Sequence, residues 1–328
     1  PLQELLVEIY GEMLGLDSDH ISIHDDFFRL GGNSIMAIKL VNKIYQRTGI
    51  QAKVIDIFNE KTINKLSLVI NHYEPEYKAV IPLNHVTDKP SAFMIHPGGA
   101  GCEVYKGLAE KLRPYCQCYG VDSYNLYNDE KITNLNDLAM YYLNHIEVIQ
   151  KSSQQKEYIL VGWCLGGQIA LEIASILESR GHKNIIILML DTILRGEDAK
   201  LMELSSVPSD DEISEEFKAP VDSELFLASK KFALAEHCIV GQKITTRLRF
   251  TRMVLLKAMV KGGKESQLLF DHIHQLDCNN LDKTIENSDL LMVYPVEASH
   301  QEIIKEEEFI IDIIKRLIHD PQKMIPLF

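Results

Sequence analysis

Short apolar runs that alternate with helix-like stretches dominate the sequence from about residue 80 onward. Each run is continuously apolar, which is typical of strands in a parallel sheet that is covered by helices on both faces. The runs are 91–96, 117–122, 158–163, 184–191 and 290–296, and the helix-like stretches are 104–113, 135–151, 165–180 and 301–318. The pattern predicts that residues 80–328 form an α/β domain with a mostly parallel sheet.

One long segment, residues 195–285, interrupts this alternation. It contains an acidic loop and two stretches, 223–237 and 247–260, that we interpret as mostly helical. So much helical material between two strands predicts a lid inserted at the carboxyl edge of the sheet. The alternative is a structural subdomain with no gating role.

Residues 1–73 have a different pattern of apolar residues, which predicts a small all-α bundle of four helices. Apolar residues recur there with helical spacing, and no convincing strand pattern is present. The prolines and mixed charges that follow predict a linker at 74–79 between two domains. Because the chain starts inside a helical pattern, we expect it to be a piece of a longer protein.

Composition narrows the classes of function. The 328 residues carry a net charge of −13, which argues against nucleic acid and anionic membranes as partners. No apolar run is long enough to cross a bilayer and no signal-peptide pattern is present, so we expect a cytoplasmic protein. The six cysteines show neither disulfide spacing nor a CxxC pair, which predicts reduced thiols and no metal site. Cys116 and Cys118 are expected on the same face of a strand.

The stretch GWCLGG, residues 162–167, lies between a strand-like run and a helix-like stretch. Glycines flank Cys164, as expected where a nucleophile is held on a sharp strand-to-helix turn. The N-terminus of the following helix favours negative charge and would lower the pKa of the thiol. The stretch predicts either a catalytic nucleophile or a buried thiol in a tight turn.

Two further residues follow strand-like runs in the chain order of an α/β-hydrolase triad: nucleophile, acid, histidine. Asp191 ends the run 184–191, and His300 follows the last run. His300 would accept the thiol proton, while Asp191 would orient the imidazole. The alternatives are Asp191 as a helix N-cap, and His300 as a surface residue with His272 or His274 as the base.

The stretch IHPGGAG, residues 95–101, ends another strand-like run and supplies backbone N–H groups. Gly99, with Ala100 close behind it, and Leu165 are the expected donors of an oxyanion hole. His96 in this stretch is expected to be structural rather than catalytic. An ordinary turn is the alternative interpretation.

The stretches FMIHPGGAG, GWCLGG, LMLDT and ASHQEI together resemble the type I thioesterase domains that end nonribosomal peptide synthetases. The resemblance spans residues from about 80 to the end of the chain. It implies an α/β-hydrolase fold with a helical lid and a triad of Cys164, His300 and Asp191. The cysteine departs from the family pattern, because most members carry serine at that position.

The stretch DDFFRLGGNS, residues 25–34, precedes a helix-like stretch with an apolar stripe. By position alone Ser34 is a helix N-cap candidate, and Asp25 and Asp26 are expected to be solvated loop charges. The stretch resembles the attachment motif of peptidyl carrier proteins, and this resemblance puts Asp26 next to the phenylalanines of the motif. This resemblance covers residues 1–73 and implies a 4′-phosphopantetheine arm on Ser34, added by a separate phosphopantetheinyl transferase.

The two resemblances imply a carrier–thioesterase didomain that works with upstream condensation and adenylation domains. Residues 1–73 have a net charge of −2, which leaves −11 for the rest, so long-range attraction cannot favour docking of the two halves. We therefore expect transient apolar docking, with Ile35 and Met36 of the carrier against the lid.

The predicted function is release of a carrier-bound peptidyl or acyl thioester through a Cys164 acyl-enzyme, by lactone or lactam closure or by hydrolysis. Loading a cysteine exchanges one thioester for another, so the acyl group stays activated, which suits a difficult ring closure. The competing functions are an editing hydrolase that clears misloaded carriers, a cysteine hydrolase of the dienelactone-hydrolase type, and a non-catalytic interaction module.

Overall fold

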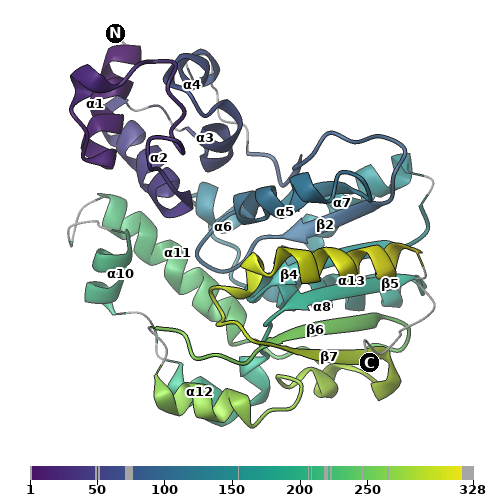
Figure 1. Ribbon diagram of the computed structural model, residues 1–328. Helices are drawn as coiled ribbons and strands as arrows, with labels where there is room; N and C mark the ends of the chain where they lie inside the picture. The colour runs from purple at the N-terminus through teal and green to yellow at the C-terminus, as the bar shows by residue number, and fades with distance from the viewer. Residues whose placement is uncertain are drawn as a thin grey trace. The chain divides into compact units, whose positions relative to one another are not determined.

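The computed structural model describes residues 2–48, 50, 52–70, 77–153, 155–205, 207, 209–217, 221, 224–245, 247–263 and 266–319. The chain forms two compact units, Pro1–Tyr77 and Lys78–Phe328 (Figure 1). The predicted linker at 74–79 falls largely on residues outside the described part of the chain, so its structure stays a prediction.

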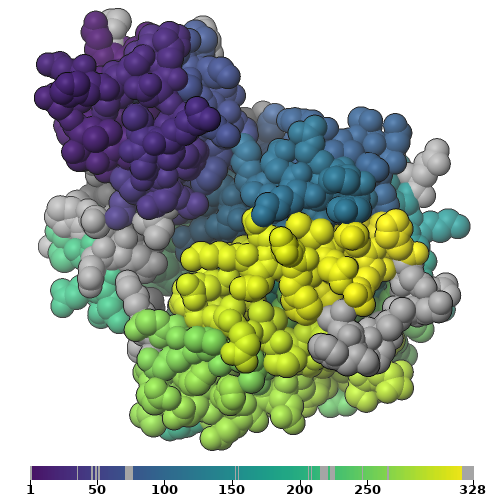
Figure 2. Space-filling view, viewed as in Figure 1, coloured from purple at the N-terminus to yellow at the C-terminus, as the bar shows by residue number. Residues whose placement is uncertain are grey.

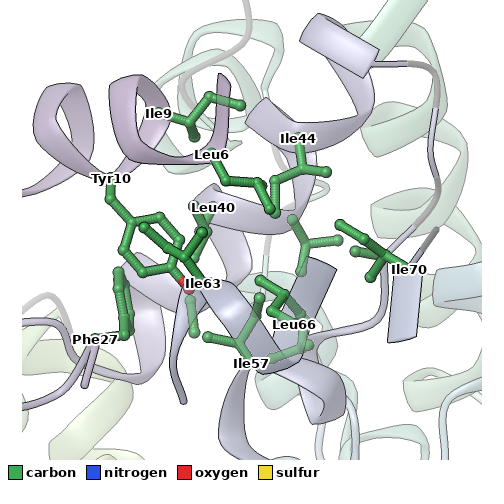
Figure 3. Close-up of a cluster of buried hydrophobic side chains, with 14 of the residues drawn as sticks. Leu6, Ile9, Tyr10, Phe27, Leu40, Ile44, Ile57, Ile63, Leu66 and Ile70 are labelled. Atoms are coloured by element: carbon green, nitrogen blue, oxygen red, sulfur yellow. The ribbon is translucent and has the colours of Figure 1, made fainter. Parts of the chain in front are cut away.

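The first unit is the predicted all-α bundle. Its helices are α1 (Leu2–Leu14), α2 (Ser34–Thr48), α3 (Val54–Glu60) and α4 (Ile63–Ile70). Apolar side chains from all four helices meet in one core, shown in Figure 3 and including Leu6, Ile9, Leu40, Ile44, Ile57, Ile63 and Leu66. Burial of each such side chain contributes about 1.5–3 kcal/mol, so this core holds the four short helices together.

A buried phenylalanine ties the long loop between α1 and α2 to this core. The ring of Phe27 packs edge-on against Tyr10, with 5.2 Å between ring centroids. The Phe27 backbone N–H donates to the Lys61 carbonyl at 2.8 Å, and the Asp26 carboxylate accepts from the Phe28 N–H at 2.9 Å. The expectation that Asp26 is only a solvated loop charge is therefore wrong, because its carboxylate holds the backbone of this turn.

Replacing Phe27 with alanine is expected to destabilise the first unit by about 3–5 kcal/mol, because a fully buried ring is lost and a cavity remains. In urea unfolding of the whole chain, far-UV circular dichroism should show an early helical transition. Trp163, the single tryptophan of the chain, lies in the second unit. The unfolding transition reported by its fluorescence should therefore keep the same urea midpoint as in the parent protein. Leu68→Ala, at a side chain that is 62% exposed, is the control and should change stability by only about 0.5 kcal/mol. Identical transitions in both variants would contradict the role given to Phe27.

The second unit is built on a mostly parallel sheet. The described strands are β1 (Val80–Pro82), β2 (Ser91–Ile95), β3 (Gln117–Val121), β4 (Tyr158–Trp163), β5 (Ile185–Leu190), β6 (Arg252–Ala258) and β7 (Leu291–Val296). Their spatial order is β1-β3-β2-β4-β5-β6-β7, and every described pairing is parallel except that of β1 with β3. The five predicted runs form β2, β3, β4, β5 and β7, which confirms the α/β fold.

Helices connect and cover these strands. The longer ones are α5 (Lys106–Lys111), α7 (Leu135–Ser152), α8 (Leu165–Ser179) and α13 (Glu307–His319). The shorter elements are α6 (Tyr124–Tyr127) and the 3₁₀ turns η2 (Cys102–Tyr105), η3 (Arg195–Glu197), η4 (Leu281–Thr284), η5 (Ser288–Leu290) and η6 (Ile303–Lys305), whereas the 3₁₀ turn η1 (Ser18–His20) belongs to the first unit. Helix α8 packs against β4 and β5, and α13 lies across the face of the sheet that is turned to the viewer in Figure 1. The last helix starts later than predicted, because residues 301–305 form turns.

The predicted helix over residues 247–260 is wrong, because Arg252–Ala258 forms β6 between β5 and β7. Both faces of this strand are buried, so its sequence is a continuous apolar run that periodicity alone cannot distinguish from a buried helix. The segment 195–285 is therefore not one helical insertion. Helices α9 (Ala199–Leu204), α10 (Asp210–Phe217) and α11 (Glu224–Val240) connect β5 to β6, and α12 (Gln267–His274) connects β6 to β7.

In the space-filling view of Figure 2, the yellow segment that includes α13 lies across the middle of the visible face of the second unit. The six cysteines are all free thiols, and the sulfur atoms of Cys116 and Cys118 lie 3.6 Å apart in the protein interior. Among the described helices, none combines the length and the apolar character that crossing a bilayer requires.

Candidate active site and attachment site

Cys164 sits on a strained turn between β4 and α8. Its backbone has φ 55° and ψ −117°, a conformation that L residues rarely adopt and that proteins retain mainly at functional sites. The Cys164 N–H donates to the Leu190 carbonyl of β5 at 3.0 Å, and the Thr192 hydroxyl donates to the Cys164 carbonyl at 3.0 Å. Hydrogen bonds from the neighbouring strand thus hold the thiol above the start of a helix.

Close backbone contacts explain the glycines around Cys164. A Cβ atom added at Gly162 would overlap the backbone of Gly166, and one added at Gly166 would overlap the Ile95 carbonyl of β2. A Cβ at Gly167 would overlap the Thr192 side chain. The turn can approach the neighbouring strands this closely only because these positions lack side chains.

His300 and Asp191 meet next to this turn, as the sequence predicted. Asp191 follows β5 directly and is buried, and the Nδ1 atom of His300 lies 2.7 Å from its Oδ2 atom. Asp191 does not cap a helix, since the next helical turn starts at Arg195. Of the two alternative bases, His272 pairs instead with Asp198 at 3.0 Å.

The electrostatics of this group favour a charged thiol. Burial by itself would raise the pKa of Cys164, but the charge and hydrogen bond of the His300 imidazole, helped by Arg195, hold that pKa below its usual value. Burial would lower the pKa of His300, whereas the Cys164 thiolate and the Asp191 carboxylate raise it. The two shifts favour a thiolate–imidazolium pair, the reactive form of a nucleophilic cysteine.

Asn279 was not predicted, yet it orients the Asp191 carboxylate. Its side-chain amide donates to Asp191 Oδ1 at 3.3 Å and to the Thr192 carbonyl at 3.2 Å, and the Ala258 N–H donates to the same Oδ1 at 3.1 Å. With Oδ1 engaged, Oδ2 remains for His300. The sequence signal for this residue is the Asn279–Asn280 pair, because asparagine is enriched among residues with positive φ. Both asparagines have a positive φ here.

Trp163 was also not singled out, and it secures the loop that carries His300. Its indole N–H donates to the His300 carbonyl at 3.0 Å, and its ring centroid lies 6.0 Å from that of His300. The Trp163 backbone N–H donates to the Tyr105 hydroxyl, which in turn donates to the Ile95 carbonyl. The loop after β7 is thereby connected to β4 and β2.

The predicted oxyanion donors lie around the start of α8. Leu165 is the first residue of that helix, and Gly99 has φ 76° in the loop after β2. The Gly99 N–H is already engaged, because it donates to Oε2 of Glu236 at 2.7 Å. Ala100, the second choice for the loop donor, follows Gly99 and is half-buried.

His96 is structural, as expected. It is buried, its Nδ1 lies 2.8 Å from the Pro97 carbonyl, and its Nε2 lies 2.9 Å from the Tyr142 hydroxyl. Burial lowers the pKa of His96 to about 4, so the ring is neutral at physiological pH. It braces the first residues of the loop after β2, which carries Gly99 and Ala100.

Two buried carboxylates brace the other end of that loop. Glu103 Oε1 accepts from the Gly101 N–H at 3.2 Å, and Asp122 Oδ1 accepts from the Cys102 N–H at 2.9 Å. Burial, reinforced by the charge of Asp122, raises the pKa of Glu103 to about 8. Glu103 therefore holds a proton in the folded protein at pH values where an exposed glutamate has lost it.

A cavity of about 200 Å³ opens beside His300. Its lining is polar and apolar in about equal parts. The polar lining residues are Asp191, Arg195, His274, His300 and Gln301, and the apolar ones include Ile193, Val260, Leu269, Phe270 and Ile273. The cavity offers a surface of mixed character next to the thiol–imidazole pair, and His274, the second alternative base, lies in its wall.

Ser34 begins α2 in the first unit and is exposed. The N-cap of α2 is Asn33, because its side chain accepts from the Met36 N–H at 2.9 Å and its carbonyl accepts from the Ala37 N–H. The N-cap interpretation of Ser34 is therefore wrong, and Ser34 is an exposed residue at a helix N-terminus. Gly31 has φ 104°, and a Cβ at Gly32 would come within 2.5 Å of the Phe27 ring, which explains the glycine pair before it.

Comparison with protein families matches both units. Residues 4–70 match the model of the phosphopantetheine attachment site, and residues 90–228 match the model of the thioesterase domain. The chain is a carrier–thioesterase didomain of the nonribosomal peptide synthetase type. The carrier family takes a 4′-phosphopantetheine covalently on a serine, so this didomain has that cofactor.

Curated relatives of the didomain are large synthetases. It is 29% identical over 194 residues to the dimodular nonribosomal peptide synthase of Bacillus subtilis (strain 168), and the aligned region covers 58% of this chain and 8% of that protein. It is 30% identical over 217 residues to tyrocidine synthase 3 of Brevibacillus parabrevis, which covers 66% of this chain and 3% of the relative. The chain thus spans less than a tenth of the length of these relatives.

Solved structures share the fold of the didomain. The holo form of AB3403, a four-domain nonribosomal peptide synthetase bound to AMP and glycine, aligns over 99% of this chain and 26% of its own, with a TM-score of 0.59 and 24% identity. The thioesterase domain of NocB, in a covalent complex with a fluorophosphonate nocardicin G analogue, aligns over 73% of this chain and 99% of its own, with a TM-score of 0.54 and 22% identity.

The charged state of Cys164 can be measured by alkylation. Because His300 lowers the pKa of the thiol, the rate of reaction with iodoacetamide should rise well below pH 9, the ordinary thiol value. In His300→Ala the rise should move to higher pH. Peptide mass spectrometry separates Cys164 from the exposed Cys238, an internal reference whose profile should be the same in both proteins. An unchanged Cys164 profile in the variant would refute the ion pair.

The raised pKa of Glu103 predicts a pH-dependent stability. Between about pH 4.5 and pH 8 the folded chain keeps a proton that the unfolded chain has lost, so stability falls as pH rises through this window. Glu103→Gln should remove this loss of stability. Relative to the parent protein, the variant should have a higher thermal midpoint, followed by Trp163 fluorescence, at pH 8.5 than at pH 5. The corresponding difference in the free energy of unfolding should amount to a few kcal/mol, on the order of 1.4 kcal/mol per pKa unit. Glu110→Gln, at an exposed side chain nearby, should show no such pH-dependent gain.

Proposed function

We propose that this didomain releases a peptidyl or acyl group from a phosphopantetheine thioester on Ser34 through a covalent Cys164 acyl-enzyme. The observation that carries the proposal is the group of Cys164, His300 and Asp191, in which the pKa of the thiol is lowered. The attachment domain on the same chain supplies the reason for such a site, since it presents an acyl group as a thioester. Release by ring closure or by hydrolysis is the corresponding reaction.

The surroundings of Ser34 fit the arm. The hydroxyl is exposed at the N-terminus of a 15-residue helix, and helix N-termini favour the negative charge of a phosphodiester. No acidic residue occupies the first turn of α2. When bound, the arm supplies a flexible thiol that holds the acyl group as a thioester.

Loading begins with the Cys164 thiolate. It attacks the thioester carbonyl carbon, and the developing oxyanion accepts hydrogen bonds from the Leu165 N–H and, once that donor is free, from the Gly99 N–H. The carbon–sulfur bond to the carrier arm then breaks. The His300 imidazolium would give its proton to the departing sulfur of the arm, which leaves the acyl group on Cys164 and the imidazole neutral.

Release reverses the roles of these groups. The neutral imidazole takes the proton of an incoming water, hydroxyl or amine, whose oxygen or nitrogen attacks the acyl carbon. The carbon–sulfur bond to Cys164 breaks and regenerates the thiolate beside an imidazolium. Asp191 keeps Nδ1 of His300 protonated throughout, so that Nε2 is the atom that exchanges protons.

The cysteine changes the energetics of this sequence. A serine would convert a thioester into a less activated oxygen ester, whereas Cys164 exchanges one thioester for another. The acyl-enzyme therefore keeps its activation for the second step, which suits closure of a strained ring or attack by a weak nucleophile. We propose ring closure for this reason, with hydrolysis as the alternative.

The remaining partners follow from the same proposal. They are upstream adenylation and condensation domains, a phosphopantetheinyl transferase and a peptidyl or acyl chain, all in the cytoplasm. Docking through the start of α2 also stays a proposal. Met36 is half-buried against the bundle core, and the side chain of Ile35 lies outside the described residues.

Intact-mass measurement tests the proposal. With a phosphopantetheinyl transferase and an acyl-coenzyme A, the parent chain should gain one acyl-phosphopantetheinyl group and then lose the acyl group, while Ser34→Ala should gain nothing. Cys164→Ala should load and then retain the acyl group at least about 100-fold longer, because the nucleophile is missing. Ser22→Ala, at an exposed serine of the same unit, is the loading control. Equal acyl loss from the parent and Cys164→Ala would refute the acyl-enzyme.

A further inference from the structure

A carboxylate from the lid region occupies one of the oxyanion donors. Glu236 belongs to α11, and its Oε2 atom accepts from the Gly99 N–H at 2.7 Å. The residue is buried, with 8% of its surface exposed. A Cβ atom added at Gly98 would lie 3.5 Å from that Oε2 and 3.8 Å from Cβ of Leu165. The carboxylate oxygen thus lies between the loop after β2 and the first residue of α8.

The Glu236 oxygen uses a donor, the Gly99 N–H, that a reacting carbonyl oxygen would also need. The oxyanion of a tetrahedral intermediate is a negatively charged oxygen that accepts from the Gly99 and Leu165 N–H groups. A carboxylate oxygen matches it in charge and in its role as acceptor. The Gly99 N–H cannot serve the substrate at full strength while it donates to Glu236 at 2.7 Å.

The end of α11 that carries Glu236 is attached to the body of the second unit. The Gln168 amide, from α8, donates to the Ile239 carbonyl at 3.4 Å and to the Gln242 carbonyl at 3.1 Å. The Gln242 side chain donates to the Thr133 carbonyl at 2.6 Å and accepts from the Leu135 N–H at 2.8 Å. These bonds keep Glu236 next to the oxyanion loop, so the donor is freed by rotation of the glutamate side chain or by release of this anchored helix end.

We propose that Glu236 is an inhibitory residue that fills the oxyanion hole of the empty enzyme and must leave it before Cys164 can be acylated. The inference rests on the proposed function and extends it. Small thioesters gain little binding energy with which to displace the carboxylate, so the contact protects the activated cysteine from them. A chain that fills the site supplies that energy through contacts remote from the carbonyl.

Two reactions of Cys164 separate this inference from other roles of Glu236. Acylation by a small thioester, an acyl-N-acetylcysteamine, needs the oxyanion hole, whereas alkylation by iodoacetamide does not. Both rates are measured at the same pH on the full chain of the parent, Glu236→Ala, Glu236→Gln and the control Glu203→Ala. Glu203 is an exposed glutamate of α9. Thermal unfolding, followed by Trp163 fluorescence, identifies a variant that has lost its fold.

The expected result is a rise in acylation of at least about tenfold in Glu236→Ala relative to alkylation, up to the roughly 10²–10³-fold that one oxyanion donor contributes. Glu236→Gln should rise less, because its amide oxygen still accepts from the Gly99 N–H but carries no charge. Glu203→Ala should match the parent. Equal or slower relative acylation in both folded Glu236 variants would overturn the inference while leaving the proposed function intact. No acylation in any protein, with alkylation normal, would overturn the proposed function and the inference with it.

Discussion

The close approach of three backbones around Cys164 is the constraint on which the site depends. Three segments meet there: β4, the start of α8 and the end of β2. They lie so close together that there is no room for a Cβ atom at position 162 or 166, and both positions are glycine. The same crowding keeps Cys164 at positive φ and aims its thiol at the carboxyl edge of the sheet. Once the thiol is placed there, the residues that follow β5 and β7 are within its reach, because the carboxyl ends of parallel strands share one edge.

Around that thiol, two carboxylates act in opposite directions. Asp191 is held by the Asn279 amide and the Ala258 N–H, so its second oxygen pairs with His300 and favours the charged form of the imidazole. Glu236 approaches from α11 and accepts from the Gly99 N–H, a donor that the proposed reaction needs. In our proposal, one carboxylate supports the reactive ion pair, while the other limits when that pair can act. Their different effects follow from their positions on either side of Cys164.

The two units solve the problem of presenting a reactive side chain in different ways. In the carrier unit, Asn33 caps α2, and Ser34, the proposed attachment residue, is exposed. In the thioesterase unit, Cys164, the proposed nucleophile, is partly enclosed, and His300 and Arg195 lower the pKa of its thiol. Under the proposed function, exposure suits a serine that a separate enzyme must reach, and enclosure suits a cysteine whose acyl group must wait for the correct nucleophile.

Local patterns in the sequence were sufficient for much of this protein. Glycine spacing around Cys164, the apolar runs of β2 to β5 and the order of Cys164, Asp191 and His300 are visible in the chain, because they arise from steric and periodic rules that act within a few residues. Tertiary structure decided the rest. Arg252–Ala258 reads equally well as helix or strand, and only its place between β5 and β7 makes it a strand. Asn279 and Glu236 are 88 and 137 residues from the groups they bind, and no local pattern encodes a contact across such a separation.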